Sequence, residues 1–257
     1  MLWEDFKMIP RQLRPCRGLV SDSKTFLADA QTLQPFYRCL RLDGQRVAAI
    51  DRYAAEHKCS LNDVCLAAFF RAFELFCPMP ANGELVAVMP TNLRRYAPLQ
   101  RRPALRNLAG TTQVRIGADL GATFEDTLAL VRHEIHRHQQ RGLGTEGQML
   151  SAWLAKLSYA GKNRVLQKQI LGSLGRHVPP VLTQIGQVRG ERLACDGMLP
   201  VDLVVFGEAS PSPVFLTTVV RLDHRIVIGV CGDSRLGEPR IEAFLAYLDR
   251  CLPGFNQ

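Results

Sequence analysis

The most constraining feature of the sequence is a helical pattern that runs almost directly into a buried-strand pattern. Ser60–Cys77 begins with a capping serine, has Asp63 three residues later, and then presents a wide apolar face that includes Phe69 and Phe73. Leu85–Met89 is a continuous apolar run, which is typical of a strand buried on both faces. The two patterns together predict an α/β protein in which helices cover a sheet.

Strand and helix patterns alternate along the rest of the chain. Apolar alternation or continuous apolar runs predict further strands at Phe36–Leu42, Thr111–Ile116, Val181–Val188, Val201–Phe206, Val214–Leu222 and Arg225–Cys231. Helical spacing predicts helices at Gln45–Lys58, Phe124–Gln139, Met149–Leu171 and Pro239–Leu252. A tight turn at Leu222-Asp223-His224 should join the last two strands, because Asp tolerates a left-handed conformation. We expect a mixed β-sheet flanked by helices, with Leu85–Met89 central and the last hairpin at or near an edge.

Two segments differ in regularity. Residues 1–35 contain Pro10, Pro15 and Pro35 and show little periodicity, so we predict a linker or crossover segment there and one domain over residues 36–257.

No run of eighteen apolar residues occurs, so no membrane span is expected, and the first fifteen residues lack the apolar stretch of a secretory signal. The eight cysteines show no Cys-x-x-Cys spacing, which predicts reduced thiols without a metal site in a cytoplasmic protein.

Part of the net charge of +8 lies in one basic loop, where five arginines fall between Arg94 and Arg106. Such a loop is either a solvated surface or a docking surface for an anionic partner. The phosphates of coenzyme A and an acidic carrier protein both qualify as that partner. Nucleic acid ranks last, because no helix-turn-helix, zinc-finger or aromatic-and-basic strand pattern accompanies the charge.

Several short motifs occur in a fixed order along residues 36–252. They are Ser60-Leu61-Asn62-Asp63, Pro90-Thr91-Asn92-Leu93-Arg94, Asn107-Leu108-Ala109-Gly110, Phe124–Arg132, Thr183-Gln184-Ile185-Gly186 and the hairpin Val214–Cys231. Their order resembles the C-terminal half of the condensation-type acyltransferase superfamily, which includes coenzyme-A-dependent acyltransferases, nonribosomal-peptide condensation domains and alcohol acyltransferases. Gln184 stands where Asn is usual, and the Asp-Phe-Gly-Trp motif of the plant branch does not occur.

This resemblance implies one chloramphenicol-acetyltransferase-like subdomain of an enzyme that joins a thioester-bound acyl group to an alcohol or amine. Coenzyme A or phosphopantetheine would be the donor thioester, with no covalently bound cofactor. The family's catalytic base belongs to a His-His-x-x-x-Asp motif, and this motif is absent from the 257 residues. We therefore expect no catalytic residue in this chain and no activity from it alone. Its expected partners are the missing N-terminal subdomain, an acyl carrier protein, and a second copy of the chain through the exposed interface.

The resemblance also assigns site residues. Arg94 would pair with the aspartate of the missing motif, and Asn92, Asn107, Thr183 and Gln184 would line the wall of the substrate tunnel. Each has a simpler interpretation. Arg94 could be one solvated arginine of the basic loop, the two asparagines could hold loops through side-chain-to-backbone bonds, and Thr183 with Gln184 could be a satisfied polar pair within a sheet.

The histidines offer little chemistry. His133, His136 and His138 lack the spacing of a His-Glu-x-x-His zinc helix. They also lie outside the predicted apolar face of the helix Phe124–Gln139, so we expect them to be solvated. His224 follows Asp223 directly, but neighbours in a tight turn rarely point at each other, and His57 suits the end of a helix. Two functions of other classes remain open: a non-catalytic binding or scaffold homologue, and a basic RNA-binding α/β protein.

Overall fold

Seven strands of the computed structural model form one mixed sheet, and the part of the chain it describes is residues 16–17, 19–20, 33–76, 83–96, 108–142, 144–145, 155–164, 177–210 and 214–254. The strand order is β1-β4-β7-β8-β9-β3, with β5 paired to β4 outside this path. The strands of this sheet are β1 (Cys16–Arg17), β3 (Pro35–Leu42), β4 (Glu84–Asn92), β5 (Ala109–Ile116), β7 (Val181–Val188), β8 (Leu216–Leu222) and β9 (Arg225–Asp233). A separate antiparallel pair consists of β2 (Leu19–Val20) and β6 (His177–Val178).

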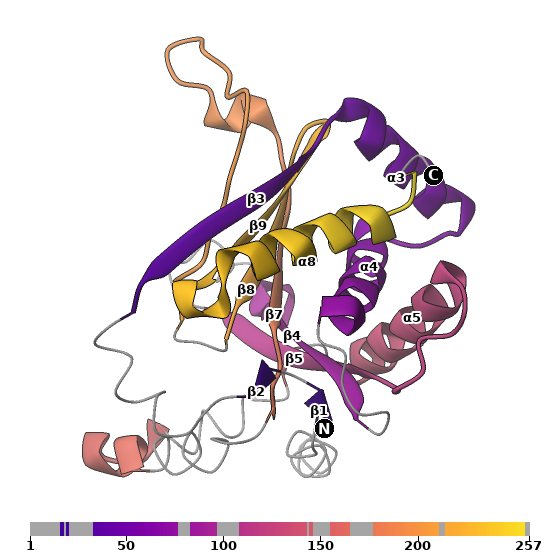
Figure 1. Cartoon of the computed structure of the whole chain (residues 1–257). Helices are drawn as coiled ribbons and strands as arrows, with labels where there is room; N and C mark the ends of the chain where they lie inside the picture. Colours follow the sequence, from indigo (N-terminus) through magenta and orange to yellow (C-terminus); the bar gives the residue numbers. More distant parts are fainter. Residues whose placement is uncertain are drawn as a thin grey trace.

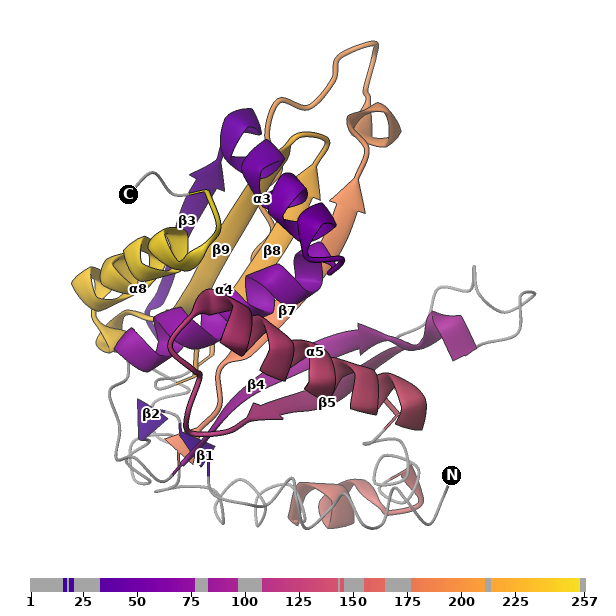
Figure 2. The same ribbon diagram turned by 90° about the vertical axis from the view of Figure 1, so that its right-hand side faces the viewer.

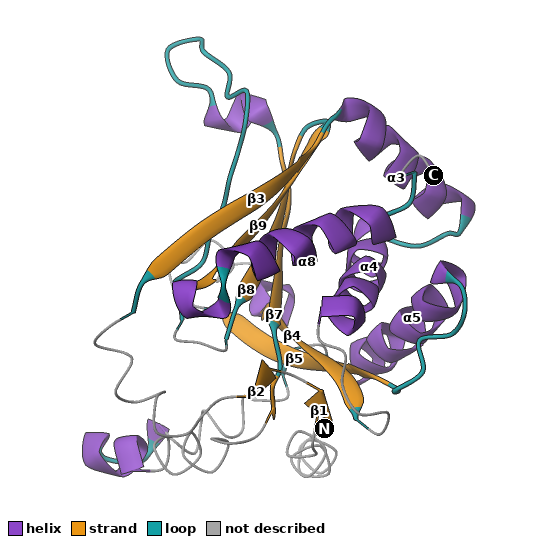
Figure 3. Cartoon of the chain, in the orientation of Figure 1, coloured by secondary structure: helices purple, strands orange, loops and turns teal. Residues whose placement is uncertain are grey.

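The longer helices cover one face of this sheet, with α4 between α8 and α5 (Figures 1, 2 and 3). They are α3 (Gly44–Glu56), α4 (Leu61–Phe76), α5 (Phe124–Arg141) and α8 (Glu238–Cys251). The capping box predicted for α4 is confirmed, since the backbone N–H of Ser60 donates to the Asp63 carboxylate at 2.9 Å and the Asp63 N–H donates to the Ser60 hydroxyl at 3.2 Å. None of the helices among the described residues is long and apolar enough to cross a membrane.

The core lies between α4, α8 and the sheet, and phenylalanine rings fill its centre. Phe73 and Phe76 of α4 meet Phe215, which precedes β8, and Phe244 of α8. The ring centroids of Phe215 and Phe244 lie 5.4 Å apart in an edge-to-face arrangement, which is a favourable geometry for aromatic pairs. In β4, the side chains of Leu85, Val86 and Ala87 are fully buried, which confirms the prediction made from the continuous apolar run.

The sheet divides where β4 meets β7. These two parallel strands pair only at Val88 and Val181, where the Val88 N–H donates to the Pro180 carbonyl at 2.9 Å. Beyond this point β7 stays paired with β8, whereas β4 stays paired with β5 and runs away from β7 (Figure 2). We call the space between the diverging strands the fork.

One strand prediction is confirmed and another requires correction. The hairpin β8–β9 lies near an edge of the sheet, as predicted, because only β3, which pairs with β9 along its full length, lies beyond it. The predicted strand Val201–Phe206 is a loop that crosses the face of the sheet opposite the helices (Figure 1). Two contacts hold its C-terminal end on the sheet: the Phe206 ring lies 5.0 Å from that of Tyr37, and the Thr218 hydroxyl donates to the backbone carbonyl of Val205. The Val201 side chain, at its other end, is exposed.

Two further predictions fall partly on residues outside the described ranges. Within the predicted linker 1–35, strands β1 and β2 are described, and β1 pairs in parallel with the start of β4. Of the predicted helix Met149–Leu171, only residues 155–164 are described, and residues 159–164 are helical. The predicted helices at Gln45–Lys58, Phe124–Gln139 and Pro239–Leu252 correspond to α3, α5 and α8.

Candidate functional site

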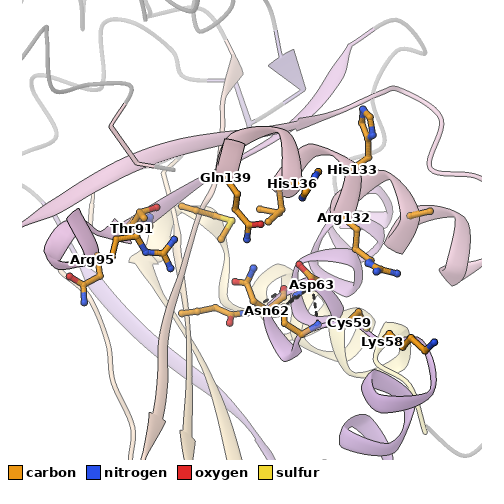
Figure 4. Close-up of a pocket in the computed structure, with 17 residues that line it drawn as sticks. Lys58, Cys59, Asn62, Asp63, Thr91, Arg95, Arg132, His133, His136 and Gln139 are labelled. Carbon is orange, nitrogen blue, oxygen red and sulfur yellow. Dashed lines mark hydrogen bonds between the residues drawn. The ribbon is translucent and has the colours of Figure 1, made fainter. Parts of the chain in front are cut away.

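Two adjacent cavities open at the fork. The larger, of about 750 Å³, lies between the first turn of α4, the end of β4 and the part of α5 from Ala129 to Gln139 (Figure 4). The smaller, of about 310 Å³, lies between the end of β4, the short 3-10 helix η1 (Leu93–Tyr96), the start of β5 and strand β7. Both cavities exist because β4 and β7 separate after one point of pairing.

The smaller cavity brings together most of the site residues predicted from the sequence. Asn92, Arg94, Thr183 and Gln184 all line it, although β4 and β7 are far apart along the chain. Arg94 is half-buried, so it is not one of a set of fully solvated arginines. The side chain of Asn92 accepts a hydrogen bond from the Arg94 N–H at 3.0 Å, which is the loop-holding role available to an asparagine at a strand end.

Part of the predicted site lies outside the described residues. Asn107 is one such residue, and its neighbour Leu108 lines the smaller cavity. Of the basic loop Arg94–Arg106, only the segment up to Tyr96 is described. The roles predicted for Arg94, Asn92, Asn107, Thr183 and Gln184 therefore stay predictions, while the proximity of four of them is observed.

The larger cavity has a basic lining. Lys58 precedes α4, Arg95 belongs to η1 and Arg132 belongs to α5. Arg95 lies on one side of the cavity, and Arg132 and Lys58 lie on the other (Figure 4). The lining also contains one carboxylate, that of Asp63, which the capping box already engages. Three cationic groups against one carboxylate favour an anionic ligand in this space.

Two of the three α5 histidines are at this cavity, which sequence reasoning missed. His133 and His136 are exposed, as predicted, but both contribute to the cavity lining. The available signal was spacing: Arg132, His136 and Gln139 recur at helical intervals and so share a face of α5.

The prediction that His138 is solvated is wrong. Its side chain is 1% exposed, and its Nε2 lies 3.1 Å from the carboxylate of Glu134, which Arg137 also contacts. His138 follows the buried Ile135 by three residues, so it continues the apolar face of α5 instead of leaving it.

Two further histidines, His57 and His224, lie at the predicted helix end and in the predicted turn. Asp223 adopts the left-handed conformation, with φ of 49°, and its carboxylate accepts from the Gly190 N–H at 3.2 Å. His224 is exposed in the same turn. His57 follows the end of α3, where its ring stacks on Tyr53 at 4.0 Å between centroids.

Gln184 lies on both cavities and is oriented by an irregularity in β7. The pairing of β7 with β8 shifts between Gln184 and Gly186, so Ile185 is an extra residue in the strand, and Gly186 has φ of 91°. Such β-bulges redirect side chains and are common beside active sites. The Gln184 amide reaches across the fork to the carbonyl of Asn62 in α4, at 3.5 Å.

Of the cysteines in the described part of the chain, Cys59 lies at the larger cavity. Six of them are unpaired: Cys39, Cys59, Cys65, Cys195, Cys231 and Cys251. Cys59 lines the larger cavity, but burial, followed by the charge of Asp63, raises the pKa of its thiol, which favours the unreactive protonated form. Among the described residues, no group of three His, Cys, Asp or Glu side chains could hold a metal ion.

Comparison with known proteins identifies the fold. No family model and no curated protein matches the sequence. The structure matches TRI3 trichothecene 15-O-acetyltransferase from Fusarium sporotrichioides, with a TM-score of 0.62, 10% identity and coverage of 85% of this chain and 47% of that one. It matches the EpoB cyclization-docking bidomain from Sorangium cellulosum, with a TM-score of 0.60, 14% identity and coverage of 97% and 48%. The fold is that of condensation domains and acyltransferases.

A third match extends this likeness. The epimerization domain of the third module of tyrocidine synthetase B aligns with a TM-score of 0.54 and 12% identity, over 93% of this chain and 51% of that one. This chain therefore spans about half the length of the structures with the condensation and acyltransferase fold. The predicted α/β architecture, a mixed sheet flanked by helices of the chloramphenicol-acetyltransferase-like type, is confirmed.

Proposed function

We propose that this chain forms one wall of an acyl-transfer site, in which a thioester-bound acyl group is joined to an alcohol or an amine. The observation that supports this most strongly is the convergence of Asn92, Arg94, Thr183 and Gln184 on one cavity at the fork of a condensation and acyltransferase fold. Their elements are separated in sequence, so a shared cavity is not a consequence of local chain geometry.

Acyl transfer needs a base for the acceptor and donors for the oxyanion that forms at the thioester carbonyl. Thr183 and Gln184 line the smaller cavity with a hydroxyl and an amide, and both groups can donate a hydrogen bond. The sequence contains no His-His-x-x-x-Asp motif. The base therefore comes from a second subdomain, whose motif aspartate would pair with Arg94.

The donor is a thioester of coenzyme A or of phosphopantetheine on a carrier protein. Lys58, Arg95 and Arg132 in the larger cavity would attract its phosphates. The basic loop that begins at Arg94 would add to this attraction and offer a docking surface for an acidic carrier protein. The second subdomain, or a second copy of this chain, would cover exposed apolar side chains such as Met198, Leu199 and Val201.

Two measurements on the purified chain test the proposal. Release of free thiol from acetyl-coenzyme A, with simple alcohols or amines as acceptors, should be absent, because general-base catalysis contributes about 10²–10⁴-fold in rate and its histidine is missing. Coenzyme A should nevertheless bind by isothermal titration calorimetry. Arg132→Ala should weaken this binding several-fold at low salt, and Arg52→Ala, at an exposed arginine of α3, should not.

Other outcomes would contradict the proposal. Coenzyme A binding that Arg132→Ala and Arg52→Ala affect equally would show that only the overall charge matters. Thiol release by the chain alone, abolished by His224→Ala, would place a catalytic base at the turn after β8.

With the second subdomain supplied, Arg94→Ala should remove about 3–5 kcal/mol of stabilisation by leaving a buried aspartate unpaired.

A further inference from the structure

The two cavities at the fork share one wall. Pro90, Thr91 and Asn92 line both cavities from the end of β4, and Gln184 lines both from β7. A larger, basic space and a smaller space are thus adjacent, and the side chains of these four residues lie between them.

The β4 side of this wall is held in place. Pro90, Thr91 and Asn92 are all in register with residues of β5, so they belong to an antiparallel ladder. Gly144 adds a second restraint, because a Cβ at this position would lie only 2.6 Å from the Cβ of Thr91. This part of the wall cannot shift without breaking backbone hydrogen bonds or displacing that close contact.

The opposite side of the wall is a single long side chain. The backbone of Gln184 is fixed by pairing with Val219 of β8, immediately before the bulge. Its amide is held across the fork by one contact, the 3.5 Å hydrogen bond to the Asn62 carbonyl, which is at the long limit for such a bond. A side chain with three rotatable bonds and one long hydrogen bond can be removed or moved without disturbing the sheet.

We propose that Gln184 is a specificity-determining residue that ends the larger cavity and limits the length of the acyl chain this site accepts. The inference rests on the proposed function, since it assumes that the larger cavity receives an acyl thioester. The acyl chain enters the larger cavity with its phosphate-bearing carrier toward Lys58 and Arg132, and its far end abuts the Gln184 side chain. Shortening that side chain opens the larger cavity toward the smaller one, whose volume is about 310 Å³, and so makes room for a longer chain.

Binding of saturated acyl-coenzyme A thioesters, from acetyl to dodecanoyl, to the purified chain tests this proposal. For the unmodified chain, affinity should rise with acyl length up to a limit and then stop rising. Gln184→Ala should move the limit to longer chains, with binding about fourfold tighter for each methylene that enters the added space. Gln184→Asn, which keeps the amide but is one methylene shorter, should give an intermediate limit.

The matched control is Ile185→Ala. Ile185 is the extra residue of the bulge and is exposed, so its truncation should leave the length limit unchanged. Equal length limits for the unmodified chain and Gln184→Ala would overturn the role of Gln184 and leave the proposed function intact. Failure of the unmodified chain to bind any acyl-coenzyme A would overturn the proposed function itself. If Gln184→Ala does not fold, Gln184→Asn alone decides between the outcomes.

Discussion

The two ends of helix α4 lie in regions of opposite character. Toward its C-terminus, Phe73 packs against Phe215, and Phe76 packs against both Phe215 and Phe244, in a buried aromatic core. At its N-terminus, the first turn faces the larger cavity at the fork, where basic and polar side chains predominate. One continuous helix therefore connects the buried aromatic core to the candidate site.

This contrast indicates that the two regions have different roles, one in stability and the other in the candidate site. The aromatic core gains stability from apolar burial and ring packing, which need no polar groups. At the fork, β4 and β7 stop pairing, so polar side chains and space replace strand-to-strand contact. A site built on the ends of a rigid helix and paired strands keeps its geometry, although its own contacts contribute little to stability.

The largest effect should come from the aromatic end. Phe69 is fully buried and its ring packs against Phe70, Phe73 and Phe244. Phe69→Ala should lower the free energy of unfolding by about 3–5 kcal/mol, measured by urea denaturation, because it removes apolar contacts and leaves a cavity. Leu75→Ala on the same helix, where the side chain is 59% exposed, should change it by less than about 0.5 kcal/mol. Similar losses for the two variants would show that the core is loosely packed.

A buried polar group on α5 should give an intermediate effect. The Glu134 side chain is 7% exposed and contacts both Arg137 and His138. Glu134→Ala leaves the buried His138 and the half-buried Arg137 without this carboxylate, so the free energy of unfolding should fall by about 1–3 kcal/mol. The exposed Gln140, on the same helix, provides the control substitution Gln140→Ala. A neutral result for Glu134→Ala would show that this buried carboxylate adds no net stability.

Gln184 should matter least to stability in neutral solution. Its hydrogen bond to Asn62 is 3.5 Å long, so Gln184→Ala should lower the free energy of unfolding by less than about 1 kcal/mol. The same urea denaturation measures this. A loss as large as that of Phe69→Ala would break the comparison, since the fork would then be a structural element as important as the core.

The smallest effect should appear only in acid. The Thr123 backbone N–H, followed by the Thr123 side chain, lowers the pKa of Asp126 at the start of α5. The folded state therefore favours the carboxylate. Its contribution is present above the unfolded pKa, about 3.9, and is lost as the pH falls through the lower folded value.

Asp126→Asn should remove this acid dependence. Denaturation midpoints measured over a series of pH values should then fall less steeply in acid than those of the unmodified chain. Glu56→Gln, at an exposed carboxylate of α3, should leave the slope unchanged. Equal slopes for the unmodified chain and Asp126→Asn would show that the Asp126 carboxylate is not the source of this acid dependence.

Local patterns predicted most elements but failed where packing came from distant residues. The capping box at Ser60 and the buried run Leu85–Met89 identified α4 and β4, because both signals depend on neighbours in sequence. Val201–Phe206 has the composition of a strand, yet it lies across the sheet face because β8 already has β7 and β9 as partners. His138 looked solvated because its polarity outweighed its helical position, and tertiary packing decided otherwise.

The sequence alone determined the longer helices, most of the longer strands and the buried face of α4, because apolar periodicity records burial residue by residue. It also indicated that Arg94 and Gln184 belong to one site, through the order of the motifs. The tertiary structure decided that β4 and β7 part after Val88, that two cavities open there, and that Gln184 lines both of them. Strand pairing across long sequence separations depends on the packing of the whole sheet, and no local pattern encodes it.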